Sequence, residues 1–299
     1  MSPPTAKQAD LFSGVRVFYR EQGNAINAPT ILLLHGFLSS SHQFRNLIPL
    51  LATEYRVTAP DLPGAGFTEA PSNFVYSFES LTAALADFLD VLHIKKFTMY
   101  IFDYGAPVGL RLALQRPEAI QAIITQNGNA YLEGFGDVWE PLREYWISDD
   151  SLEDRKKIED TLLTFEAIKS QYEHGTPDVS RVPLESYYTD HALLQRPRMR
   201  EIQIDLLMDY QNNLDLCAEF QEYFRKSQVP LFAIWGKNDA IFGPAGAKAF
   251  KRDLPNAEIR LIDAGHVAVE SHTELIAEDI LTFLREKNLW ELDVGMGVM

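Results

Sequence analysis

Apolar and polar residues follow two different periods along the first third of the chain. Residues 14–21, "GVRVFYRE", alternate between apolar and polar side chains, which is typical of a β-strand. Short apolar runs predict further strands within 29–37, 55–66, 96–102 and 119–127. The segments between them have helical spacing, and the most periodic one, 77–94, offers Ser77 and Ser80 as candidate N-caps. Strands that alternate with helices predict a parallel sheet covered by helices on both faces.

The pattern changes after Asn127. The next hundred or so residues are rich in Trp, Tyr and charged side chains, show helical spacing in 151–168 and 199–213, and lack a run typical of a buried strand. Strand and helix patterns alternate again in 229–239, 244–254, 257–266 and 273–287. We therefore predict an α/β core domain made of residues 1–128 and 229–299, interrupted by a helical lid (cap) domain at 129–228.

Composition and charge disfavour several kinds of partner. The chain of 299 residues has 27 basic and 42 acidic side chains, a net charge of −15, which argues against binding to nucleic acid phosphates. The longest purely apolar run is "ILLL", far short of the ~18 residues that a membrane-spanning helix needs. The first ten residues have no apolar stretch, so we expect no secretory signal. A small molecule is the partner that we expect.

The cysteine and histidine residues bear on the compartment of the protein and on metal binding. Cys217 is the only cysteine, so an internal disulfide is impossible, which fits the reducing cytoplasm. No cluster of Cys and His has the spacing of metal ligands. We expect a cytoplasmic protein with neither a metal nor a cofactor.

Three polar residues follow predicted strands of the sheet. Asp103 comes after the strand in 96–102, Asp239 ends 229–239, and His266 ends 257–266. Ligands of open α/β sheets bind outside the carboxyl ends of the parallel strands, so these side chains are candidates for one site. Asp103 also stands at a turn from a strand into a helix, where the helix dipole favours an anion.

The three residues occur in the order nucleophile, acid, histidine, which is the order of the α/β-hydrolases. The motifs around them are "HGF" (35–37), "PDLPGAG" (60–66), "FDYGAPVG" (102–109), "WGKND" (235–239) and "DAGHVAVE" (263–270). With these motifs the sequence resembles the aspartate-nucleophile branch of the α/β-hydrolase superfamily, the epoxide hydrolases and haloalkane dehalogenases, over residues 12–288. The resemblance implies an α/β-hydrolase fold: a mostly parallel sheet with helices on both faces and an inserted helical lid. One departure is Ile101, which stands where the elbow motif has its first glycine.

The resemblance also implies a mechanism. An aspartate has an ordinary pKa near 3.9, so Asp103 is ionised at neutral pH and attacks carbon directly to form an ester. His266 then activates water to hydrolyse the ester, and Asp239 orients His266. The oxyanion formed in that step is stabilised by the backbone N–H groups of Phe37 and Tyr104.

Alternatives to these roles are open in the sequence. Asp103 alone would fit a helix N-cap, and Asp263, three residues before His266, competes with Asp239 as the acid. The end of 119–127 carries amides and no carboxylate, so it offers no further acid. We interpret His35 as a structural residue of the oxyanion loop.

The lid has to supply the group that stabilises the leaving group. Tyr145 and Tyr210 are the candidate phenols for an epoxide oxygen, and Trp139 and Trp146 are the candidate indole donors for a halide. Dehalogenases of this branch usually place tryptophan after the nucleophile, where this chain has Tyr104, so we favour epoxide hydrolysis over dehalogenation. "HGFL" in place of the usual "HGFP" of epoxide hydrolases is a weakness of this hypothesis. A third hypothesis is a dedicated secondary-metabolite hydrolase, a cyclase or a binding protein that uses the same pocket.

Overall fold

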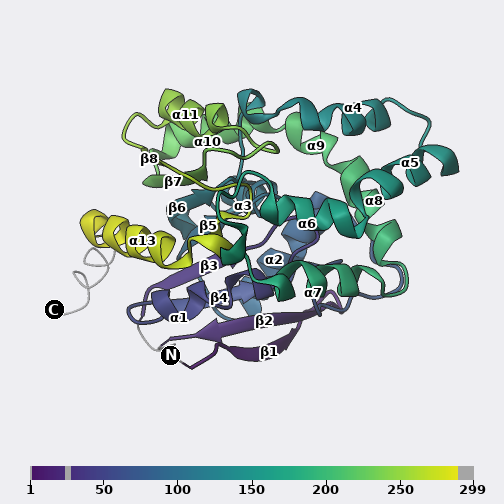
Figure 1. Cartoon of the computed structure of the whole chain (residues 1–299). Coiled ribbons are helices and arrows are strands. Elements are labelled where there is room, and N and C mark those ends of the chain that lie inside the picture. Colours follow the sequence, from purple (N-terminus) through teal and green to yellow (C-terminus); the bar gives the residue numbers. More distant parts are fainter. Residues whose placement is uncertain (1, 24–27, 289–299) are drawn as a thin grey trace.

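A single eight-stranded sheet forms the centre of the protein (Figure 1). The structure, a computed structural model, describes residues 2–23 and 28–288. The strands are β1 (Thr5–Asp10), β2 (Arg16–Gln22), β3 (Thr30–Leu34), β4 (Arg56–Pro60), β5 (Phe97–Ile101), β6 (Ile120–Gln126), β7 (Leu231–Gly236) and β8 (Glu258–Ile262). Their order across the sheet is β1-β2-β4-β3-β5-β6-β7-β8. The first two strands pair antiparallel, and all strands from β4 to β8 in that order run parallel, which confirms the predicted fold class.

Strand β1 is the one strand of the described residues that the sequence pattern did not indicate. Five of its six residues are exposed, so it lacks the apolar alternation that marks a half-buried strand. It lies at the edge of the sheet, where polar residues such as Lys7 and Asp10 discourage pairing with another chain.

The central strands were easiest to predict because both of their faces are covered. Every residue of β3, β5 and β7 is buried, which explains their continuous apolar runs. The covering helices are α1 (Leu47–Leu51), α2 (Phe78–Val91), α3 (Gly105–Gln115), α10 (Cys217–Ser227), α11 (Pro244–Asp253) and α13 (Thr273–Lys287). Helices α1 and α13 pack together on one face, and α2, α3, α10 and α11 pack in succession on the other. The side chain of Ser77 caps α2.

The chain between β6 and β7 forms helices and short turns (Figure 1). These helices are α4 (Glu140–Trp146), α5 (Leu152–Leu162), α6 (Phe165–Glu173), α7 (Leu184–Leu194), α8 (Met199–Asp209), α9 (Gln211–Leu214) and α10. The single helical stretch expected at 151–168 is broken, because Thr164 caps a new helix by accepting a hydrogen bond from the N–H of Ala167. Helix α10 lies inside the predicted lid, 129–228, yet packs against α3 and α11 of the core.

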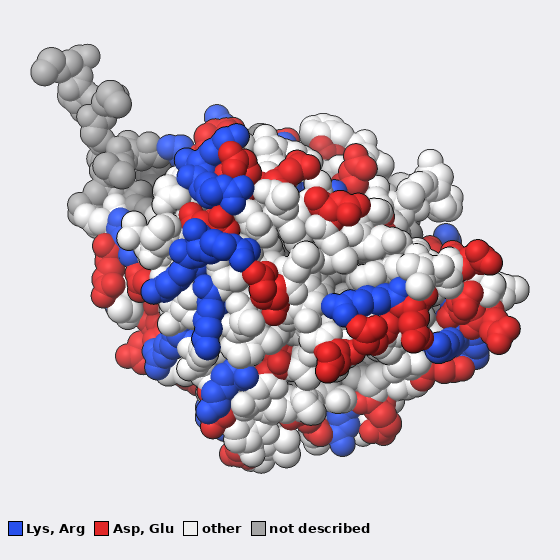
Figure 2. All heavy atoms as spheres, turned by 90° about the horizontal axis from the view of Figure 1, so that it is seen from above, with Lys and Arg blue, Asp and Glu red and all other residues white. Residues whose placement is uncertain are grey.

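The surface carries both signs of charge. Figure 2 shows basic side chains gathered toward the left of one face, with acidic side chains beside them and over the rest of that face. Within the described residues, no helix combines the length and apolar character needed to cross a membrane.

Candidate active site

Asp103 lies in a tight turn between β5 and α3. Its φ of 45° is left-handed, a conformation that aspartate tolerates better than most residues and that recurs where strain serves function. A β-carbon at Gly105 would lie 2.4 Å from the carbonyl oxygen of Leu34, so only glycine lets α3 begin this close to the sheet. The turn thus presents the carboxylate at the carboxyl end of the central strands.

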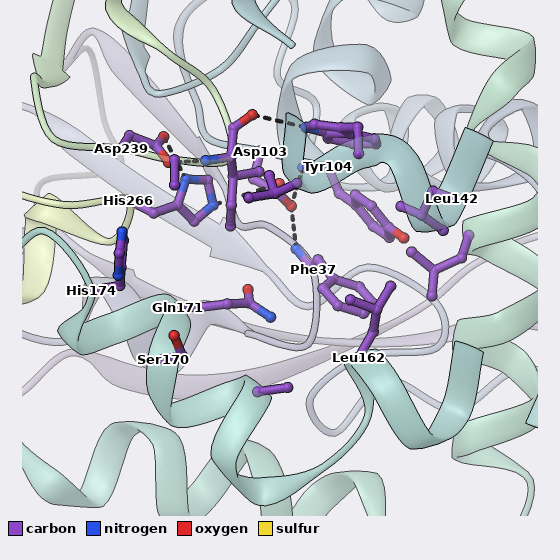
Figure 3. A pocket seen from close by; sticks show the side chains of 16 residues that line it. Phe37, Asp103, Tyr104, Leu142, Leu162, Ser170, Gln171, His174, Asp239 and His266 are labelled. Atoms are coloured by element: carbon purple, nitrogen blue, oxygen red, sulfur yellow. Dashed lines mark hydrogen bonds and ion pairs between the residues drawn. The ribbon is translucent and has the colours of Figure 1, made fainter. Parts of the chain in front are cut away.

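The two oxygens of Asp103 have different surroundings (Figure 3). Oδ1 accepts hydrogen bonds from the backbone N–H of Phe37, at 2.5 Å, and of Tyr104, at 2.7 Å. Oδ2 lies 3.6 Å from Nε2 of His266. A β-carbon at Gly36 would come 2.6 Å from the β-carbon of Asp103, which explains why the loop that carries Phe37 needs glycine there. One oxygen is therefore held by two N–H groups, while the other is available for attack.

The departure at Ile101 has a packing counterpart. A β-carbon at Gly109 of α3 would lie 2.8 Å from Cγ2 of Ile101, so Gly109 gives the branched side chain its room. The absence of glycine at position 101 therefore does not prevent α3 from packing on β5.

His266 and Asp239 follow β8 and β7, and the structure brings them together. Oδ2 of Asp239 lies 2.8 Å from Nδ1 of His266, and Oδ1 accepts a hydrogen bond from the N–H of Ile241 at 2.7 Å. Burial lowers the pKa of His266, but the charges and hydrogen bonds of Asp239 and Asp103 outweigh it and raise that pKa well above its ordinary value. The imidazole ring therefore holds a proton at neutral pH.

The competing residues lie elsewhere. Asp263 is exposed and binds Lys237 Nζ at 3.2 Å and Asn238 Nδ2 at 2.9 Å. His35 is buried; its Nε2 accepts from the N–H of Leu62, so its Nδ1 donates to the carbonyl of Gly36. This arrangement agrees with a structural role for His35 in the oxyanion loop.

The amides at the end of β6 belong to the site, although the sequence pattern gave them no role. Asn127 Nδ2 donates to Oδ2 of Asp239 at 2.7 Å. Gln126 Nε2 donates to the carbonyl of His266 at 2.8 Å and to Oδ1 of Asn127 at 2.6 Å. Both amide side chains are fully buried. Their position at a strand end, next to the predicted triad, was the signal that could have indicated them.

A cavity of about 410 Å³ opens above Asp103. It is lined by Phe37, Asp103, Tyr104, Val138, Trp139, Leu142, Leu162, Ala167, Ser170, Gln171, His174, Leu207, Asp239, Ala240, Ile241 and His266. Besides the triad and Tyr104, its polar side chains come from α6 and the residue that ends it: Ser170, Gln171 and His174. Figure 3 shows Gln171 reaching into the cavity opposite Asp103. The helical spacing at 151–168 did not indicate which side chains of this segment face the cavity.

The four aromatic residues predicted from the lid are not equivalent. Trp139 lines the cavity, but its indole N–H donates to the carbonyl of Ile241 at 2.8 Å. Trp146 lies outside the lining, and its N–H donates to the carbonyl of Leu207 at 2.8 Å. Tyr145 is also outside the lining, with its hydroxyl 2.5 Å from Asp150. These three donors are engaged within the protein.

Tyr210 forms a second layer behind the cavity wall. Its ring packs against those of Tyr104, Trp139 and Phe78. Its hydroxyl makes no hydrogen bond within the described part of the chain, and burial, followed by the charge of Asp103, raises its pKa. The hydroxyl of Tyr104 is also buried without a partner among the described residues.

Comparison with known proteins shows the fold family. The family described as the alpha/beta hydrolase fold matches residues 29–273. A protein named an uncharacterized hydrolase from Saccharomyces cerevisiae is 49% identical over 91% of this chain and 94% of its own. The solved structure of the haloalkane dehalogenase DbeA from Bradyrhizobium elkani, 22% identical, covers 94% of this chain and 98% of its own with a TM-score of 0.78. The epoxide hydrolase CorEH, 18% identical, covers 95% and 99% with a TM-score of 0.77.

Proposed function

Because the chain belongs to the α/β-hydrolase fold family, we propose that it hydrolyses a small, largely apolar epoxide through a covalent ester on Asp103. The observation that carries the proposal is the asymmetry of the Asp103 carboxylate. One oxygen is held by two N–H groups, and the other lies beside His266 under a cavity with mainly apolar walls. Such a site suits displacement at carbon by a carboxylate.

In the first step, Oδ2 of Asp103 attacks a ring carbon, and the carbon–oxygen bond of the epoxide breaks. The oxygen departs as an alkoxide that stays attached to the substrate and has to be protonated. We assign its hydrogen-bond donor to the side-chain amide of Gln171, which faces Asp103 across the cavity. Tyr210, which lies behind the cavity wall and whose hydroxyl has no partner within the described residues, is our candidate for the phenol that relays the proton, and this role requires its hydroxyl to turn into the cavity.

In this mechanism His266 supplies the proton that the alkoxide needs. Two carboxylates keep His266 protonated in the free enzyme. Ester formation removes the charge of Asp103, so the pKa of His266 falls. The released proton balances the new alkoxide, and the ring becomes the neutral base that the second step requires. Departure of a halide, which is a weak base, would instead require this proton to be lost to solvent.

In the second step, neutral His266 takes a proton from water, and the hydroxide attacks the ester carbonyl of Asp103. The resulting negative charge develops on Oδ1, where the N–H groups of Phe37 and Tyr104 already point. Collapse of this intermediate breaks the bond between Cγ and Oδ2, and the proton left on the new carboxyl group passes to the departing oxygen. The diol and the carboxylate are released, and His266 is protonated again. The diol therefore keeps an oxygen that came from Asp103.

Dehalogenation is the second candidate, and the engaged indoles argue against it. A halide needs preorganised N–H donors, whereas the N–H groups of Trp139 and Trp146 both bind backbone carbonyls. A dedicated secondary-metabolite hydrolase or cyclase would use the same ester chemistry on one substrate. A panel of epoxides and alkyl bromides separates these candidates: we expect diols from epoxides and little bromide release.

The covalent step is tested by a single turnover in water enriched in oxygen-18. We expect the first diol formed to carry ordinary oxygen, and Asp103 to gain the label. Direct incorporation of the heavy isotope into that first product would exclude the ester. Rapid bromide release, with no diol from any epoxide, would instead assign the protein to the dehalogenases.

A further inference from the structure

The amide of Asn127 is buried beside the triad and has no place in the mechanism above. Its Nδ2 donates to Oδ2 of Asp239 at 2.7 Å, and its Oδ1 accepts from the N–H of Gly236 at 2.9 Å and from Gln126 at 2.6 Å. These bonds fix which end of the amide faces the carboxylate. Asn127 thus presents an N–H to the same oxygen that contacts His266.

We propose that Asn127 is a positioning residue that shares Oδ2 of Asp239 with His266 and thereby limits how strongly Asp239 stabilises the imidazolium. An N–H that hydrogen-bonds a carboxylate stabilises its charge, so less of that charge acts on a second donor. The proposal rests on the proposed function in one respect: it assumes that His266 acts as a base in the second step.

The reason for such a limit lies in the second step. A carboxylate that bonded His266 alone would hold the ring protonated after the ester has formed, and a protonated ring cannot activate water. The charged groups that face His266 are Asp103, from the turn after β5, and Asp239, after β7. The rings that pack on it, Phe102 and Phe242, carry no charge. Once Asp103 is esterified, Asp239 is the remaining carboxylate that faces His266. In our proposal, the hydrogen bond from Asn127 weakens the effect of that carboxylate on the pKa of His266.

The end of β6 also holds the geometry of the pair. Gln126 donates to the carbonyl of His266, and Asn127 donates to the side chain of Asp239. Asn127 has a φ of 49°, a left-handed conformation that asparagine tolerates and β-branched residues avoid. One dipeptide therefore ties together the loops after β7 and β8.

The test is an NMR titration of the His266 ring in full-length protein that carries Asp103→Asn, which mimics the neutral ester. Asn127→Gly keeps the left-handed backbone and deletes the amide, and Asn127→Ala is the second variant. We expect either to raise the pKa of His266 by roughly one unit, the effect of losing a hydrogen bond to a charged group. An unchanged or lowered pKa in a folded variant would overturn the proposal.

A matched control deletes a different buried amide. Asn129 lies two residues away and bonds within its own loop, to the carbonyl and N–H of Tyr131. Asn129→Ala should leave the pKa of His266 unchanged. If Asn129→Ala shifted the pKa of His266 as much as Asn127→Gly does, the cause would be a loosened loop and not the lost N–H of Asn127.

A kinetic arm uses protein with Asp103 intact and styrene oxide as the probe. Asn127→Gly should slow ester hydrolysis at pH 7 about tenfold, move its optimum to higher pH, and slow alkylation less. Equal slowing of both steps without a pH shift would contradict the inference. If no ester forms in any protein while the titration still shifts, the proposed function fails and the role of Asn127 stands.

Discussion

The cavity has a floor and a roof that differ in how their polar groups are satisfied. The floor consists of Asp103, Asp239 and His266 at the ends of parallel strands, and hydrogen bonds hold both carboxylates. The polar residues of the roof are Ser170, Gln171 and His174, whose side chains make no hydrogen bond within residues 2–23 and 28–288.

The two sides of the cavity are therefore suited to different tasks, catalysis and substrate binding. Groups that break and form bonds gain from being preorganised, because they need no rearrangement when charge develops. Groups that bind a substrate are better left without a hydrogen-bond partner in the free protein. A donor that already bonds a buried group would have to break that hydrogen bond, at a cost in free energy, before it could bind a ligand. The floor is thus suited to ester chemistry, and the roof is suited to choosing the leaving group.

The largest expected effect comes from the floor. His266→Gln should slow ester hydrolysis by roughly 10²–10⁴-fold, because the base of the second step is lost. Alkylation should slow less, since the variant loses only the proton that His266 releases to the alkoxide. An adduct mass should then accumulate on the peptide that contains Asp103. Asp239→Asn should slow the same step. In Asp103→Asn no adduct should form, and an adduct in that variant would place the nucleophile elsewhere.

A smaller effect is expected from the roof. Gln171→Leu keeps the approximate shape but removes the amide, so the rate of alkylation by an epoxide should fall about tenfold to hundredfold. Ester hydrolysis should change little, because in the proposed mechanism Gln171 contacts the leaving oxygen, and it makes no hydrogen bond with His266 within the described residues. Ser170→Ala, on the same helix, is the matched control. Equal rates for Gln171→Leu and the control would remove Gln171 from the mechanism.

Tyr210 and Tyr145 allow a direct comparison between a hydroxyl without a hydrogen-bond partner and a hydroxyl that has one. Tyr210→Phe removes a hydroxyl without a partner among the described residues and should slow alkylation by about threefold to tenfold. Tyr145→Phe removes a hydroxyl bound to Asp150 and should lower thermal stability slightly, with both rates unchanged. Stopped-flow alkylation and thermal melts measure both effects. If Tyr145→Phe slowed alkylation more than Tyr210→Phe did, Tyr145 would be the proton donor.

A buried carboxyl group outside the triad lies where helices α6 and α7 pack together. Asp190 of α7 accepts a hydrogen bond from Tyr172, next to Gln171 on α6, and burial raises the pKa of Asp190 well above its ordinary value. The charged groups Glu270 and Arg45 lie nearby.

This shift predicts how stability depends on pH. Between the ordinary and the raised pKa, folded protein keeps a proton that unfolded protein releases, so stability falls as pH rises through that window. Asp190→Asn removes the titration and should raise the melting temperature more at pH 8 than at pH 5. A larger gain at pH 5 would mean that Asp190 is ionised in the folded state.

Sequence patterns predicted the floor better than the roof, for a physical reason. Parallel strands end at one edge of a sheet, so strand patterns alone bring Asp103, Asp239 and His266 together. The roof depends on where helices break. Thr164 starts a new helix inside a stretch that looked continuous, and that break sets the face that α6 presents.

Chemical type alone was a poor guide to the lid. Tyr145 and Trp146 have suitable donors, but the structure uses those donors on Asp150 and Leu207. Gln171 was not among the candidates, since nothing in the sequence pattern distinguishes a glutamine that faces the cavity from one that faces solvent. The roles of all lid residues stay predictions until they are tested kinetically.

The smallest expected effect concerns the acid that competes with Asp239. Asp263 is exposed and pairs with Lys237 and Asn238, whose hydrogen bonds lower its pKa. Asp263→Asn removes a solvent-screened charge that does not contact His266, so ester hydrolysis should stay within about twofold of the wild type. The measurement is the decay of the Asp103 adduct at pH 7, beside Asp239→Asn under the same conditions. If Asp263→Asn slowed the decay more than Asp239→Asn, then the exposed carboxylate, and not the buried one, would be the partner of His266.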